Sequence, residues 1–148
     1  MKVTGAELVD WLETSAIRFA PIDLLKTTEQ ALLDPTVPAF NFDVISSPDL
    51  TYEIDVTKPL APMGQKASGR INNVLFKGAP LDMAAQFVVA TNNYRASGGG
   101  NFPGLNGSKT IYASPDASRD EGARSALQTR SSRSRIASSA ASTSRSAA

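Results

Sequence analysis

The spacing of apolar side chains near the start of the chain predicts an amphipathic helix. Apolar and small residues recur three or four positions apart, so a helix places them on one face and most acidic residues on the other. Thr4 and Glu7 fit the capping-box pattern, in which each side chain bonds the other residue's backbone amide. Because Pro21 cannot continue a helix, we expect one helix over Gly5–Ile17. Its apolar face carries Leu8, Trp11, Leu12, Ser15, Ala16 and Phe19.

Strand patterns follow in the middle of the chain. Phe40–Ile45 and Thr51–Val56 alternate apolar with polar residues, and Ser46–Asp49 between them has the composition of a turn, so a β-hairpin is predicted. Arg70–Phe76 predicts a third strand and Gln86–Thr91 a fourth. Because Gln86–Thr91 is almost wholly apolar, we expect a central strand that is buried on both faces. These elements predict an α+β domain with a mixed β-sheet and a capped N-terminal helix.

The composition of the chain changes near residue 116. Residues 1–116 carry 9 basic and 12 acidic side chains, whereas residues 117–148 carry 6 arginines and 2 acids. Ser, Ala and Arg make up 24 of the 32 positions in 117–148, which leaves too little apolar surface to offset the entropy lost on ordering. We therefore expect one domain over 1–116 and a disordered tail over 117–148.

The chain contains no histidine and no cysteine. This excludes a thiol nucleophile, a cysteine-based zinc site, an iron–sulfur cluster and a Ser-His-Asp triad. A two-metal phosphoesterase centre usually combines imidazole with carboxylate ligands, so it is not expected in this chain either. We expect no cofactor or metal in this chain.

Membrane and nucleic-acid partners are not expected. Met1–Leu8 lacks the apolar run of a signal peptide, and the apolar stretches elsewhere are far shorter than a membrane span. The arginines of 117–148 could neutralise phosphates, but no aromatic residues are interleaved with them and alanine dilutes them.

The segment from Asn92 to Asn101 is the candidate binding loop, because a polar, glycine-rich stretch after a strand is a common position for a site. Tyr94 offers a ring on which a base can stack, or else closes the strand end with its hydroxyl in water. Asn92 and Asn93 could bond a ligand or cap the strand end locally. Gly98–Gly100 could bring backbone amides to a ligand or form a flexible turn, and it lacks P-loop or dinucleotide-site spacing.

Other charged and aromatic residues favour ordinary structural roles. Arg95 could meet a phosphate, although a solvated arginine is the commoner arrangement. Glu53 and Asp55 lie on the polar face of a predicted strand, so we expect these two carboxylates to be solvated. Paired carboxylate catalysis by Asp43, Glu53 and Asp55 is not expected. Trp11, on the apolar face of the predicted helix, is expected in the core.

Two stretches resemble the C-terminal domain of the 5'-nucleotidase family. Val3–Glu13 resembles the opening helix of that domain, and Ala90–Gly100 resembles its substrate-loop motif. Phe40–Ile45, Tyr52–Pro59 and Arg70–Asn73 lie between them in the expected order. The form Asn-Asn-Tyr-Arg is similar to the 2',3'-cyclic-nucleotide 2'-phosphodiesterase/3'-nucleotidase branch. The resemblance spans residues 2–116 and implies a truncated 5'-nucleotidase C-terminal-like domain.

In that family an N-terminal metallophosphoesterase domain holds two divalent metals and performs the chemistry, while the C-terminal domain grips base and ribose between two aromatic rings. The resemblance implies that Tyr94 is the second ring. It places the first ring in a motif that would precede Met1, so Met1 is expected to be an internal start. Relatives carry an acid for sugar contact where this chain has Gly100. The substrate-binding set implied is Asn92, Asn93, Tyr94, Gly98, Gly99, Gly100 and Asn101.

The function implied is nucleotide recognition within a hydrolase that cleaves 2',3'-cyclic nucleotides and 3'-nucleotides. Without the metal-bearing half, this fragment is expected to be inactive and to bind nucleosides or nucleotides weakly. The family is periplasmic, whereas a chain without a signal peptide is expected in the cytoplasm. A free-standing nucleotide-binding module and a non-functional product of a disrupted gene remain alternatives, and a frame shift in a GC-rich gene would produce the Ser/Ala/Arg tail.

Overall fold

The structure is a computed structural model that describes residues 1–60 and 69–114. The tail predicted over 117–148 and the last two residues of the predicted domain lie outside the described residues. No helix within the described ranges has the length and hydropathy of a bilayer-spanning segment.

The predicted N-terminal helix is confirmed as α1, Gly5–Ala16. Its first turn is closed by the predicted capping box: the Glu7 amide donates to the Thr4 hydroxyl at 3.2 Å, and the Thr4 amide donates to the Glu7 carboxylate at 3.0 Å. At the other end, the Arg70 guanidinium donates to the carbonyls of Ala16 and Phe19 at 3.0 and 2.7 Å. The Ala16 carbonyl also accepts from the Phe19 amide at 3.1 Å, so a turn of backbone and a buried arginine together close the C-terminal end of α1.

The strands form two antiparallel sheets, which confirms the α+β class but not the single mixed sheet that was expected. One sheet pairs β1, Lys2–Thr4, with β5, Gln86–Val88. The other has the order β2-β3-β4, formed by Leu50–Ile54, Ile71–Phe76 and Ala79–Pro80.

The predicted hairpin between Phe40–Ile45 and Thr51–Val56 is wrong. Ala39–Asn41 forms a single 3-10 turn, η1, and β2 pairs with β3 instead. The carbonyl of Asp43, which a ladder would have used, accepts hydrogen bonds from the Trp11 indole at 2.6 Å and the Ser15 hydroxyl at 2.7 Å. Side chains of α1 therefore bind this segment where a neighbouring strand was expected.

The prediction of a central strand over Gln86–Thr91 is also wrong. Only Gln86–Val88 forms β5, and its neighbour in the sheet is the three-residue strand β1. Phe87 and Val89 are buried, whereas Gln86 and Val88 are exposed. The segment thus covers the core with one face, because the structure places no second layer over its other face among the described residues.

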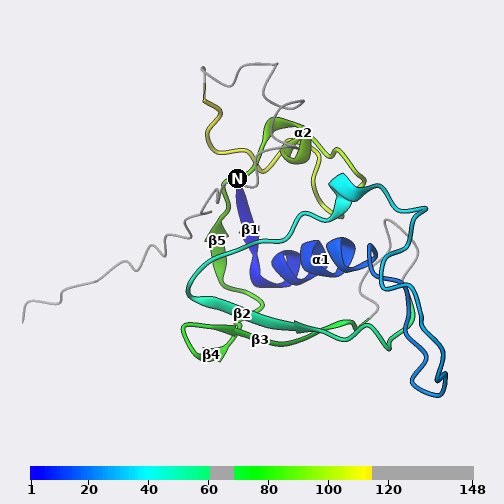
Figure 1. Ribbon diagram of the computed structural model, residues 1–148. Helices are drawn as coiled ribbons and strands as arrows, with labels where there is room; N and C mark the ends of the chain where they lie inside the picture. The colour runs from blue at the N-terminus through cyan, green and yellow to red at the C-terminus, as the bar shows by residue number, and fades with distance from the viewer. Residues whose placement is uncertain (61–68, 115–148) are drawn as a thin grey trace, which may run out of the picture.

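The hydrophobic core lies around α1. Figure 1 shows this helix between the three-stranded sheet and the short helix α2, Asn93–Ala96. The apolar face of α1 packs on side chains from β1, β3, β5 and the segment after α2. The buried cluster includes Val3, Leu8, Trp11, Leu12, Ala16, Ile45, Leu50, Ile71, Leu81, Phe87, Val89, Phe102 and Leu105.

Candidate functional site

The two asparagines of the candidate loop organise α2. The Asn92 side-chain oxygen accepts from the Arg95 amide at 2.8 Å, which makes Asn92 the N-cap of the helix. The Asn93 side-chain oxygen accepts from the Tyr94 amide at 2.8 Å. Both side-chain oxygens accept from nearby backbone amides. Asn92 and Asn93 therefore form local bonds, as one of the two expectations had it, but at the start of a helix and not at the end of a strand.

Tyr94 presents one ring face outward and rests the other on the glycine run. A methyl group built on Gly99 would lie 2.6, 2.5 and 2.5 Å from the ring atoms Cδ1, Cε1 and Cζ. Near-equal distances to three consecutive ring atoms place Gly99 against the face of the ring, not against its edge. Tyr94 is nevertheless 53% exposed. The loop therefore holds the Tyr94 ring with one face covered by Gly99 and the rest of the ring accessible to solvent, and we call this ring the Tyr94 shelf.

The glycine run is a tightly packed loop in which a side chain has no room. A Cβ on Gly100, whose φ is +79°, would lie 2.2 Å from Arg95 Nη1 and 2.6 Å from Asn41 Oδ1. A Cβ on Gly98 would lie 2.6 Å from the Leu105 carbonyl oxygen. The role of these glycines in this structure is close backbone packing.

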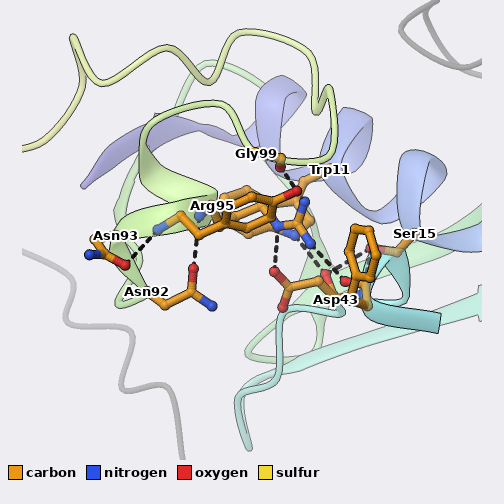
Figure 2. Close-up of polar contacts among 9 residues, drawn as sticks. Trp11, Ser15, Asp43, Asn92, Asn93, Arg95 and Gly99 are labelled. Carbon is orange, nitrogen blue, oxygen red and sulfur yellow. Dashed lines mark hydrogen bonds and ion pairs between the residues drawn. The ribbon is translucent and has the colours of Figure 1, made fainter. Parts of the chain in front are cut away.

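Arg95 is buried, so the expectation of a solvated arginine is wrong. Its side chain is 3% exposed, and its Nε lies 2.7 Å from the Asp43 carboxylate. The guanidinium also donates to the carbonyl of Gly99 and, at 2.9 Å, to that of Phe40. It lies 3.8 Å from the centroid of the Phe102 ring. With these contacts made, Arg95 anchors the loop (Figure 2) and is not placed as a free phosphate ligand.

Asp43 connects this loop to the N-terminal helix. While its carboxylate pairs with Arg95, its backbone carbonyl accepts from Trp11 and Ser15 of α1 (Figure 2). Trp11 is buried as predicted, and its ring meets Phe102 edge-on at 5.6 Å. One network of hydrogen bonds thus joins α1, the 39–45 segment and the α2 loop. In the sequence, its only sign is a pair of oppositely charged residues, Asp43 and Arg95, far apart in the chain.

The remaining predicted residues divide between the loop and the surface. Asn101 follows the glycines in a left-handed conformation with φ of 58° and is exposed. Glu53 accepts from the Asn73 side chain, and Asp55 accepts from the amide and hydroxyl of Thr57. These bonds from Thr57 lower the pKa of Asp55. The structure does not bring Asp43, Glu53 and Asp55 together as a catalytic set.

Phe40 belongs beside the site although its sequence pattern indicated only a strand. Its ring is 61% exposed and lies 6.3 Å from the Tyr94 ring, with an angle of 83° between the two planes. A solvent-exposed pair of aromatic side chains, one from η1 and one from α2, therefore adjoins the glycine loop.

Comparisons with known proteins identify the family of this domain. Residues 1–107 match the family described as 5'-nucleotidase, C-terminal domain. The chain is 44% identical over 119 residues to the trifunctional nucleotide phosphoesterase protein YfkN of Bacillus subtilis, covering 77% of this chain and 8% of that protein. It is 42% identical over 125 residues to the 2',3'-cyclic-nucleotide 2'-phosphodiesterase/3'-nucleotidase of Haemophilus influenzae, covering 80% of this chain and 19% of that protein. The enzyme of the same name from Salmonella typhimurium is 41% identical over the same lengths.

The chain therefore spans less than a fifth of each of these relatives. A search of solved structures found no significant match. The matched residues 1–107 contain α1, both sheets, α2 and the glycine loop, so the geometry described above is that of the matched domain. The resemblance seen in the sequence is confirmed: this chain belongs to the 5'-nucleotidase C-terminal domain family.

Proposed function

We propose that this domain recognises nucleotides by stacking the base on the exposed face of Tyr94, as part of a hydrolase for 2',3'-cyclic nucleotides and 3'-nucleotides. One observation carries the proposal: the Tyr94 ring lies flat on Gly99 and remains half exposed. A ring supported on one face loses little freedom when a ligand covers the other. The names of the two phosphodiesterase/3'-nucleotidase relatives supply the nucleotide class.

The expected affinity is low. A base stacked on one aromatic ring contributes about 1–3 kcal/mol. Millimolar affinity already needs about 4 kcal/mol after the loss of translational and rotational freedom. We therefore expect adenosine nucleotides to bind this chain with a dissociation constant of about a millimolar or weaker, and Asn92, Asn93 and Asn101 to add at most a few polar contacts.

We assign the chemistry of hydrolysis to residues outside this chain. The sequence has no histidine or cysteine, and within residues 1–60 and 69–114 no three acidic side chains gather as a metal ion would require. The two divalent metals implied by the family do not fit the side chains that these described residues offer. The purified chain should not hydrolyse 2',3'-cyclic AMP, and turnover that survives repurification and rises with Mn²⁺ would contradict this assignment.

The stacking role can be tested by titrating the full chain with adenosine and following the Tyr94 ring protons by NMR. Stacking should shift these resonances through the ring current of the base. Tyr94→Ala should abolish binding, while Tyr94→Phe should largely keep it because the π-face is preserved. Tyr112→Ala is the matched control, since Tyr112 is an exposed tyrosine outside the loop. Adenosine binding that Tyr94→Ala leaves unchanged would contradict the proposal.

A further inference from the structure

The Phe40 ring is exposed, while contacts of the neighbouring backbone and side chains hold its segment in place. Its carbonyl accepts from Arg95 Nη2 at 2.9 Å, and the next residue, Asn41, is buried. Phe42 packs edge-on against Phe19, with ring centroids 5.4 Å apart. The backbone on both sides of the Phe40 ring is therefore anchored, and the ring itself projects beside Tyr94.

The same guanidinium binds the backbone next to both rings of the pair. Arg95 binds the Phe40 carbonyl from one side and the Gly99 carbonyl, beneath the Tyr94 ring, from the other. A buried arginine with these partners cannot move without breaking both contacts. The backbone that carries Phe40 is thus tied to the loop that carries Tyr94, although the two residues lie 54 positions apart in the sequence.

The orientation of the pair decides what Phe40 can do. Two rings that sandwich a base must be parallel, whereas the planes of Phe40 and Tyr94 meet at 83°. Phe40 is therefore not a second shelf. A base lying on Tyr94 would instead meet Phe40 at the base's edge, where C–H and N–H groups carry partial positive charge that suits contact with an aromatic face.

We propose that Phe40 forms a wall of the base site and favours purines over pyrimidines, an inference that rests on the stacking role of Tyr94. A pyrimidine is a single ring and fits over the tyrosine ring alone. A purine has two fused rings, so it extends beyond Tyr94 and reaches the wall. Phe40 is in this sense a specificity-determining residue of the nucleotide site.

The test compares adenosine and cytidine binding to the full chain, by NMR titration, for wild type, Phe40→Leu and Phe42→Leu. Leucine keeps apolar bulk but removes the aromatic face. Phe42→Leu is the matched control, because Phe42 lies on the same segment but contacts Phe19 instead. An edge-to-face contact predicts that Phe40→Leu weakens adenosine binding about 2- to 10-fold and leaves cytidine binding within about 2-fold. Phe42→Leu should change neither.

The outcomes separate this inference from the proposed function. If wild type binds no nucleoside, or binds independently of Tyr94, the proposed function fails. If adenosine binding needs Tyr94 but is equal in wild type and Phe40→Leu, only the wall is refuted. Tighter adenosine binding in Phe40→Leu would mean that Phe40 covers the Tyr94 shelf, and equal losses for adenosine and cytidine would refute purine selection. A nuclear Overhauser contact between adenine protons and the Phe40 ring would support the wall directly, even if Phe40→Leu proved unstable.

Discussion

Replacing Arg95 with methionine should destabilise the domain far more than the loss of a surface charge does. Methionine keeps an apolar stem of similar length against Phe102 but removes every donor of the guanidinium. The lost partners are the carboxylate of Asp43 and the carbonyls of Gly99 and Phe40. A hydrogen bond to a charged group contributes about 1.5–3 kcal/mol, which would give at least about 4.5 kcal/mol for three.

The sum must be reduced because Asp43 is not fully buried. Its side chain is 34% exposed, so its carboxylate regains part of its hydration when Arg95 is absent. We therefore expect a loss of about 3 kcal/mol in the free energy of unfolding, at the lower end of the cost of removing one partner from a buried pair. Since small domains have about 5–15 kcal/mol in total, the variant should still fold in dilute buffer.

Urea denaturation of the full chain, followed by Trp11 fluorescence, measures this loss. With a slope of about 1.5 kcal/mol/M, the midpoint should fall by about 2 M. Lys26→Met removes an exposed cation and should shift the free energy of unfolding by less than about 0.5 kcal/mol. Asp43→Asn keeps an acceptor for Arg95 and should lie between the two. Equal midpoints for Arg95→Met and Lys26→Met would show that the buried network does not hold the α2 loop.

Three further perturbations test individual contacts. Gly99→Ala places a methyl group 2.5 Å from the Tyr94 ring, so the ring protons should shift and stability should fall by about 1–3 kcal/mol; unchanged Tyr94 resonances would contradict the packing described. Thr4→Ala removes the N-cap acceptor and should cost about 1 kcal/mol in a urea titration, whereas an unchanged midpoint would deny the cap its role. Hydrogen bonds from Lys109 and the Thr4 amide lower the pKa of Glu7 below its ordinary value of 4.5. Ionised Glu7 therefore stabilises the folded state fully above pH 4.5, and this stabilisation is lost as the pH falls through the lower pKa of the folded state. The stability difference between wild type and Glu7→Gln should accordingly be largest above about pH 5 and shrink below about pH 4, and a difference independent of pH would refute the pairing.

The sequence by itself determined the features whose causes are local. The period of the apolar residues and the Thr4–Glu7 capping box predicted α1 to within one residue at its C-terminal end, because helix hydrogen bonds and caps join residues three or four positions apart. The strand patterns that became β2 and β3 were recognised for a similar reason, since alternation reports one buried face. Family membership also followed from short motifs, and the match over residues 1–107 confirms it.

Tertiary structure alone decided how the candidate site is built. Phe40–Ile45 has the alternation of a strand, but a strand also needs a neighbouring strand to pair with. Here the Asp43 carbonyl accepts hydrogen bonds from side chains of α1 instead. The sequence around Arg95 predicts a surface residue. Only the fold brings the Asp43 carboxylate, 52 positions earlier, to 2.7 Å from the Arg95 guanidinium. The wall formed by Phe40 is invisible in sequence for the same reason. Contacts between distant segments depend on how the whole chain packs, and no local pattern of residues encodes which of them will meet.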